Sequence, residues 1–186
     1  LKANYPADFM AAMLTSVMDN TDKVSQYIEQ CKRMGIKILP PDINASQVNF
    51  SVDKGAIRFG LAAIKNVGEA ALSVMMAERE EGGSFLSLMD FCSRVDFHAV
   101  NKRSVENFIR CGCFDSLGTK RAQLLAVFPS VSEAAAMVQR DRANGQMGLF
   151  DAEEVRQVAE IKLPDIPEAE PEVLIGWEKE ITGFYI

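Results

Sequence analysis

The sequence predicts a mainly α-helical protein: a helical bundle with two glycine-centred turns and one small β-hairpin. Apolar residues recur at intervals of three and four along most of the chain, which is the period of an amphipathic helix. Glycines separate these segments, at positions where helices commonly end. Only the stretch 48–61 alternates with a clear period of two, so it predicts the pair of strands.

The first 61 residues predict two helices followed by the hairpin. The first helix covers 6–18, with Pro6 in its first turn, and the second starts at Asn20 or Thr21 and ends at Gly35. A short extended segment follows, and then two strands flank Asp53-Lys54-Gly55. Because a two-stranded hairpin is only marginally stable alone, we expect it to pack against the helices.

The remaining elements are predicted to be helices joined by short turns, apart from one extended linker. Asn101 and Thr119 are expected as N-caps, because their side chains can accept a hydrogen bond from the first turn. Pro164, Pro167 and Pro171 mark the linker, and a final amphipathic helix follows it. The predicted helices before the linker are 61–65, 68–80, 84–93, 101–111, 120–128 and 130–143.

Composition places the chain among ordinary globular proteins. It has 186 residues, 48% of them apolar and 25% charged, and no apolar run approaches the length of a membrane span. Its net charge of −6 alone argues against a nucleic-acid partner. The acidity lies near the end, however: residues 151–180 hold ten acids and three bases, whereas residues 1–150 hold sixteen acids and seventeen bases.

Few residues offer the chemistry of catalysis or of metal binding. The chain has a single histidine, His98, and no serine-hydrolase or zinc-protease motif. A zinc site of Cys111 and Cys113 with Cys92 and His98 is an alternative, but the spacing matches no standard zinc pattern. Because the cysteines have apolar neighbours, we expect buried, reduced thiols and no metal.

The first glycine turn has the arrangement of a helix-hairpin-helix motif. A short apolar helix reaches Asn66-Val67-Gly68, and a helix rich in small residues follows. The free N–H groups at the start of this second helix favour a phosphate, and Gly68 lets a nucleic-acid strand approach the backbone. The candidate DNA-binding residues are Lys65, Asn66, Val67 and Gly68. The alternative is an ordinary helical hairpin in which the glycine merely turns the chain.

The second glycine turn, over 109–118, has bases on both sides. Residues 101–144 contain seven bases and four acids, and the candidate phosphate contacts are Lys102, Arg103, Arg110, Lys120 and Arg121. The alternative is a solvated charged face.

A short peptide before the acidic stretch has the composition of a docking motif. In it, Gln146 precedes Met147, Leu149 and Phe150. A Leu-Phe pair can fill an apolar pocket on a partner while the glutamine amide bonds at its rim. The alternative is that Leu149 and Phe150 pack into the core.

Taken in order, these features resemble one family, the alpha subunits of bacterial DNA polymerase III, which are family C replicative polymerases. The resemblance covers essentially all of 1–150 and resumes near the end. The runs that carry it are YPADFMAA (5–12), MDNTDK (18–23), MGIKILPPDIN (34–44), IRFGL (57–61), IKNVGEA (64–70), VNKR (100–103), CGCFDSLG (111–118) and WEKEITGFY (177–185). One departure is Asn66, where the family usually has glycine; asparagine tolerates a left-handed backbone.

The resemblance implies a division of the chain. Residues 1–35 would be the end of the fingers region, 36–118 a helix-hairpin-helix DNA-binding region, and 119–150 helices with the clamp-binding peptide. Residues 151–172 would be an acidic linker and 173–186 the start of the next module. Since the chain starts at Leu1 and stops at an apolar run, we expect it to be part of a longer protein.

The resemblance also implies a role. The palm carboxylates and Mg²⁺ of a DNA-directed DNA polymerase, a nucleotidyltransferase, would lie upstream of Leu1, so we expect no catalysis and no cofactor in this stretch itself. It would grip duplex DNA without reading its sequence and dock on the sliding clamp (beta subunit), in the bacterial cytoplasm at the nucleoid. Other replicase subunits are further expected partners. The alternatives are a purely structural helical scaffold and a repair-type helix-hairpin-helix protein.

Overall fold

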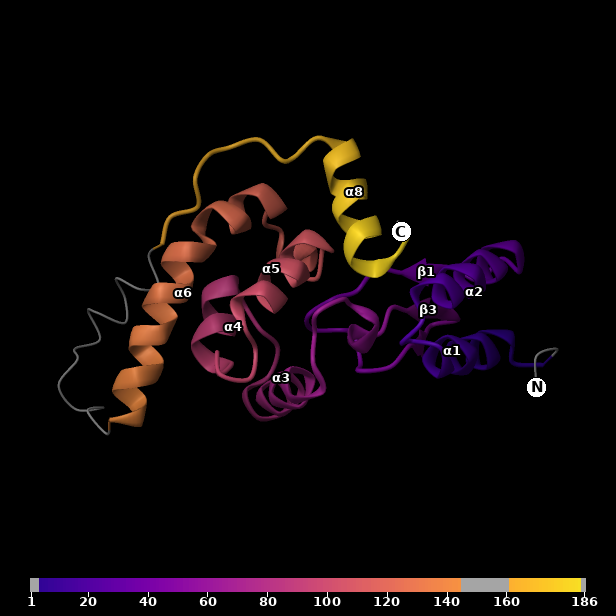
Figure 1. Cartoon of the computed structure of the whole chain (residues 1–186), viewed down its shortest axis with the longest axis horizontal. Coiled ribbons are helices and arrows are strands. Elements are labelled where there is room, and N and C mark those ends of the chain that lie inside the picture. Colours follow the sequence, from indigo (N-terminus) through magenta and orange to yellow (C-terminus); the bar gives the residue numbers. More distant parts are fainter. Residues whose placement is uncertain (1–3, 145–160, 185–186) are drawn as a thin grey trace.

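The computed structural model describes residues 4–144 and 161–184, and it confirms a mainly α fold with a small sheet. Figure 1 shows an elongated arrangement, with α1 and α2 at one end and α6 at the other. In chain order the elements are α1 (Pro6–Ser16), α2 (Thr21–Arg33), β1 (Ile38–Leu39), β2 (Ser51–Asp53), β3 (Ala56–Arg58), the 3₁₀ turn η1 (Leu61–Ala63), α3 (Glu69–Gly82), α4 (Leu88–Arg94), α5 (Lys102–Arg110), η2 (Asp115–Leu117), α6 (Arg121–Ala143) and α8 (Pro171–Thr182).

The N-terminal elements agree with the prediction, with one addition. The Asn20 side chain accepts a hydrogen bond from the N–H of Lys23 and caps α2, and the chain leaves α2 through Gly35 at a φ of 73°. The hairpin of β2 and β3 turns at Lys54 and Gly55, which both have a positive φ. The addition is β1, which pairs in parallel with β3 and makes a three-stranded sheet. The hairpin is therefore supported at its edge as well as on its face.

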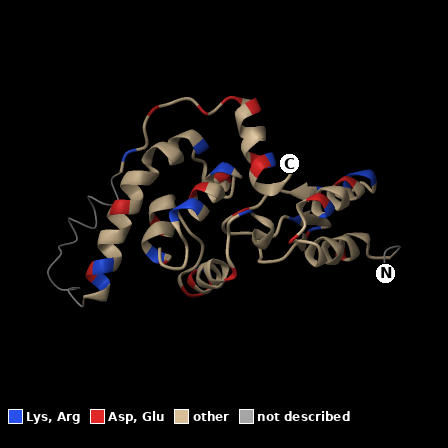
Figure 2. Ribbon diagram, viewed as in Figure 1, with Lys and Arg blue, Asp and Glu red and all other residues tan. Residues whose placement is uncertain are grey.

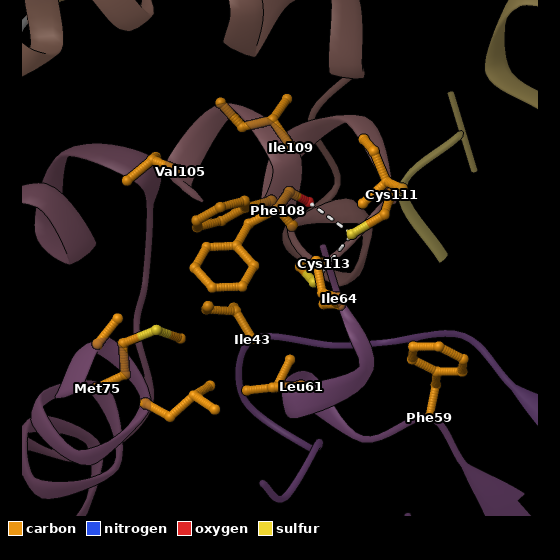
Figure 3. Close-up of a cluster of buried hydrophobic side chains, with 14 of the residues drawn as sticks. Ile43, Phe59, Leu61, Ile64, Met75, Val105, Phe108, Ile109, Cys111 and Cys113 are labelled. Carbon is orange, nitrogen blue, oxygen red and sulfur yellow. Dashed lines mark hydrogen bonds between the residues drawn. The ribbon is translucent and has the colours of Figure 1, made fainter. Parts of the chain in front are cut away.

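One continuous core joins the sheet to the helices. Figure 3 shows Leu61 and Ile64 facing Phe108 of α5 and Met75 of α3 across this core. Three phenylalanine rings pack edge to face against Phe91, whose ring centroid lies 4.9 Å from that of Phe85, 6.3 Å from that of Phe108 and 5.4 Å from that of Phe114. The turn that follows η1 is thus held by a packed layer directly beneath it.

The prediction of two helices over 120–143 was wrong, because α6 runs unbroken through Pro129. A proline inside a helix costs about 3 kcal/mol, since it removes a hydrogen bond and crowds the preceding turn. Here Val127, Phe128 and Val131 are buried on both sides of the proline, and α6 packs on both α4 and α5. We conclude that this burial outweighs the local cost.

Three smaller corrections concern the ends of elements. Thr119 does not cap α6: Lys120 is the N-cap, and its backbone N–H donates to the Gln123 side chain at 3.3 Å. The predicted helix over 61–65 is a single 3₁₀ turn, and Pro171, placed in the linker, instead opens α8. A proline suits this position because the first helical N–H has no partner inside the helix.

The acidic segment and α8 return the chain to the body. Residues 161–170 form neither helix nor strand, and α8 brings the C-terminal end back beside β1 and α2 (Figure 1). The buried Phe184 ring lies 5.3 Å from the ring of Phe59, and the Ile181 carbonyl accepts a hydrogen bond from the N–H of Lys65. The end of α8 is therefore fixed against Lys65, at the start of the first glycine turn.

All four cysteines are free and buried, as the sequence predicts. The Cys111 and Cys113 sulfurs lie 3.5 Å apart, and burial raises the pKa of the Cys92 thiol to about 12 (Figure 3). Within the described residues, no group of three or more Cys, His, Asp or Glu side chains is placed to hold a metal ion. In the same part of the chain, no helix is long and apolar enough to cross a membrane.

Candidate nucleic-acid interface

The first glycine turn presents an open helix N-terminus. Asn66 has a φ of 63°, a left-handed conformation that asparagine tolerates better than most residues. Gly68 is the N-cap of α3 and has no side chain to bond the first turn. Among the residues that the structure describes, none accepts a hydrogen bond from the N–H of Gly68, Glu69 or Ala70. These N–H groups, at the positive end of the helix dipole, are available to an anion.

Two buried side chains of α5 hold this turn from beneath. The Ser104 hydroxyl donates to the Asn66 carbonyl at 2.8 Å, and the Asn107 amide donates to the Lys65 carbonyl at 2.8 Å. Ser104 is 1% exposed and Asn107 is 5% exposed. Both carbonyls are therefore bonded to buried side chains of α5, which fixes the backbone of the turn.

Exposed bases lie beside these donors. Lys65 belongs to the turn itself, and Lys102 and Arg103 form the first turn of α5, directly before Ser104. The Ser104–Asn66 bond brings the start of α5 against the turn. Figure 2 shows bases at α5 and at both ends of α6, and acids along the segment that leads to α8. The structure thus places Lys102 and Arg103 with the first turn rather than the second.

At the second glycine turn, the Arg121 side chain is bonded within the protein. Arg121, which the sequence suggested as a phosphate contact, is only 8% exposed. Its guanidinium bonds the Asp115 carboxylate at 2.7 Å and lies 2.8 Å from the Glu178 carboxylate of α8. We correct its assignment: Arg121 is a structural residue that joins α6, η2 and α8.

The other bases of the second turn are also engaged. The Lys120 ammonium donates to the Ile166 carbonyl at 3.1 Å, although the side chain is exposed. Arg110 lies 3.8 Å from Glu106, one helical turn earlier, and its Nε is buried without a partner among the described residues. The structure therefore does not bring these bases to the open N-terminus of α3.

Sequence reasoning missed the residues that position the site. Ser104 and Asn107 lie three residues apart on the face of α5 that also carries Val105 and Phe108, and polar groups on a buried face are a usable signal. Glu168, described below, lies in a stretch of similar acids and offers no such signal. Gln146, Met147, Leu149 and Phe150 lie outside the described residues.

The fold and the turn together define the class. A short helical turn, a left-handed residue at Asn66 and a following helix with an open N-terminus make the helix-hairpin-helix arrangement. In agreement, residues 35–124 match the family model described as the helix-hairpin-helix motif.

Similarity to known proteins extends beyond this motif to the full chain. The chain is 43% identical over 192 residues to DNA polymerase III subunit alpha of Vibrio cholerae, and 43% identical over 189 residues to that of Escherichia coli K12. It is 40% identical over 189 residues to that of Thermus aquaticus. Each alignment covers 100% of this chain, but the chain spans only 15–16% of the length of these curated relatives. The chain is therefore related, from end to end, to one part of the DNA polymerase III alpha family.

Proposed function

We propose that this chain holds duplex DNA without reading its sequence, as the helix-hairpin-helix part of a replicative DNA polymerase. The observation that carries the proposal is the open N-terminus of α3 beside the exposed Lys65, Lys102 and Arg103. Backbone N–H groups and bases recognise phosphates, which every DNA sequence presents alike. The polymerase context is supported by the end-to-end match to DNA polymerase III alpha subunits.

The geometry supports a direct approach of the phosphate to the backbone. A Cβ built on Gly68 would meet no protein atom within 4 Å, so this side of the turn is open. A DNA phosphate seated there would accept hydrogen bonds from the N–H groups of Gly68 and Glu69. Lys65, Lys102 and Arg103 would supply the charge, which also compensates for the nearby Glu69 carboxylate.

The first experiment measures binding of a labelled duplex to the 186-residue chain across a salt titration. Lys102→Glu and Arg103→Glu should each weaken binding and flatten the dependence on salt, by about one unit of log–log slope per lost phosphate contact. Lys23→Glu is the matched control, because Lys23 is also an exposed base in the first turn of a helix. Absence of binding at low salt, or equal losses in all three variants, would contradict the proposal.

The second part of the proposal is docking on the sliding clamp through Gln146, Met147, Leu149 and Phe150. Its support is the composition of this peptide and its place between α6 and the acidic segment. Docking would keep the polymerase near its template, because a tethered enzyme rebinds at a high effective concentration. Contacts with other replicase subunits and a cytoplasmic place at the nucleoid follow from the same proposal.

Clamp docking is tested by replacing Leu149 and Phe150 with alanine and measuring affinity for a purified clamp. The control is Leu163→Ala, because Leu163 is an exposed leucine beyond the peptide. We expect a loss of affinity only when the peptide is changed, with DNA binding intact. Unchanged clamp affinity in the Leu149/Phe150 variant would refute docking through this peptide.

Nucleotidyl transfer is proposed only for a longer polymerase, of the kind that the relatives represent, and not for this stretch of chain. That chemistry uses Mg²⁺ held by clustered carboxylates, and the described residues gather no such cluster. A purely structural scaffold is the competing function, and the salt titration separates the two because a scaffold would not bind duplex DNA.

A further inference from the structure

The N-terminus of α6 is occupied by a carboxylate from far along the chain. The two oxygens of Glu168 accept hydrogen bonds from the N–H of Arg121 at 2.7 Å and of Ala122 at 2.9 Å. These are the first two residues of α6, and their N–H groups have no partner within the helix. Glu168 thus makes, within the molecule, the contact that a phosphate makes at an open helix N-terminus.

The rest of the segment 161–170, which we call the strap, is bound to the same turn of α6. Lys120 donates to the Ile166 carbonyl at 3.1 Å, and the Gln123 amide donates to the Pro164 carbonyl at 2.8 Å. Although partial burial acts in the opposite direction, hydrogen bonds from backbone N–H groups and the charge of Arg121 lower the pKa of the Glu168 carboxyl. The occupant is therefore an anion held by both charge and geometry.

The net charge around the N-terminus of α6 also depends on Glu168. The bases Lys120 and Arg121 stand with three carboxylates, those of Asp115, Glu178 and Glu168. The group carries a net charge of −1 when Glu168 is counted and is neutral without it. Both the occupied N–H groups and the excess negative charge oppose a phosphate at the second turn.

We infer that Glu168 is an internal anion that closes the second glycine turn to DNA and confines phosphate binding to the first turn. The inference rests on the proposed function, because it concerns where the duplex is held. The two turns have similar surroundings in the sequence but differ in the structure: the first N–H groups of α3 have no acceptor among the described residues, whereas those of α6 bond a carboxylate.

The test follows backbone amide signals by nuclear magnetic resonance while inorganic phosphate, and then a short duplex, is added to the full chain. In the unchanged protein we expect the Gly68 and Glu69 amides to shift and the Arg121 and Ala122 amides to stay. In Glu168→Ala, the Arg121 and Ala122 amides should also shift, in a saturable manner. Asp165→Asn is the control, because it removes an exposed strap carboxylate and should give the unchanged pattern.

The outcomes separate this inference from the proposed function. Arg121 and Ala122 amides that fail to shift in folded Glu168→Ala, or that shift equally in the unchanged protein, would overturn the inference. Gly68 and Glu69 amides that never respond to the duplex would overturn the proposed function instead. If Glu168→Ala does not fold, Glu168→Gln retains an acceptor without the charge; we expect a weaker shift at Arg121 and Ala122, and no shift would again overturn the inference.

Discussion

The N-termini of α3 and α6 follow similar sequence patterns, but their first N–H groups are bonded differently in the structure. Each helix follows a short 3₁₀ turn and a glycine, and each lies near several bases. At α3 the turn is held from below by Ser104 and Asn107, and its N–H groups remain open. At α6 the same kind of groups are bonded to Glu168, and Arg121 is bonded to Asp115 and Glu178. Distant residues, rather than the local motif, decide which turn can receive a phosphate.

The largest expected effect comes from removing the base buried at the second turn. Arg121→Ala removes the guanidinium from both the Asp115 carboxylate and the mostly buried Glu178 carboxylate, and breaking a buried ion pair costs about 3 kcal/mol of unfolding free energy. Urea denaturation measures this loss. If the comparison holds, duplex affinity stays unchanged under conditions where the variant is folded. A stable Arg121→Ala variant with weak DNA binding would instead show that Arg121 contributes to the DNA interface.

Replacing a glycine by alanine should lower the free energy of unfolding at the second turn and leave it nearly unchanged at the first. Gly112 has a φ of 86°, and a Cβ there would collide with the side chains of Arg121 and Asp115, so Gly112→Ala should cost about 1–3 kcal/mol. Gly68 has a φ of −82° and open space around it, so Gly68→Ala should change stability by less than about 0.5 kcal/mol.

DNA binding completes this pair of variants. Gly68→Ala should weaken duplex binding by filling the space that the phosphate needs, while Gly176→Ala, at another glycine with open space, should leave binding unchanged. Thermal unfolding and duplex titration of the three variants provide the measurements. Unchanged DNA affinity in Gly68→Ala would show that the DNA phosphate does not approach the backbone at this turn.

The side chains beneath the first turn should matter moderately for stability and more for DNA binding. Each hydrogen bond to a turn carbonyl contributes about 1 kcal/mol, so Ser104→Ala and Asn107→Ala should each lose about that much. Duplex affinity should fall in both variants because the turn is released. Ser104→Thr keeps the hydroxyl and should restore affinity; failure of this rescue would argue that Ser104 acts through packing alone.

The smallest effect concerns acid sensitivity at the second turn. Because the folded-state pKa of Glu168 is lowered, its stabilising contribution is present above the ordinary carboxyl pKa and is lost as the pH falls through the lowered value. Glu168→Gln should therefore reduce stability at pH 7 by about 1 kcal/mol or less, and the difference should shrink below about pH 4. A difference that is constant with pH would show that the charge contributes nothing.

Local patterns predicted most of the fold and the position of the first turn. Apolar spacing located the helices, and Asn20, Gly35 and Asn101 were identified as end signals because capping depends on neighbouring residues. Pro129 was misread because its local cost is visible in the sequence, whereas the burial that outweighs it is not. The parallel pairing of β1 with β3 was missed for the same reason, since strands two residues long leave almost no pattern.

The candidate site was predicted only in part, because charge in a sequence does not reveal its partners. Lys65 and Gly68 could be assigned to the turn from their position in the motif. Arg121 looked like any other flanking base until the structure placed it between Asp115 and Glu178, one near in sequence and one far. In the sequence, Glu168 is likewise indistinguishable from its acidic neighbours. Only the structure shows that its carboxylate contacts α6.

The hydrogen bond between the Lys65 N–H and the Ile181 carbonyl also has a consequence for how the chain is made. Lys65 is synthesised before Ile181, which is among the last residues described. Contacts between distant residues form late, because the chain between them must first be ordered. During translation the first turn can gain its support from α5 well before α8 exists, but it reaches its final set of bonds only when the C-terminal helix arrives.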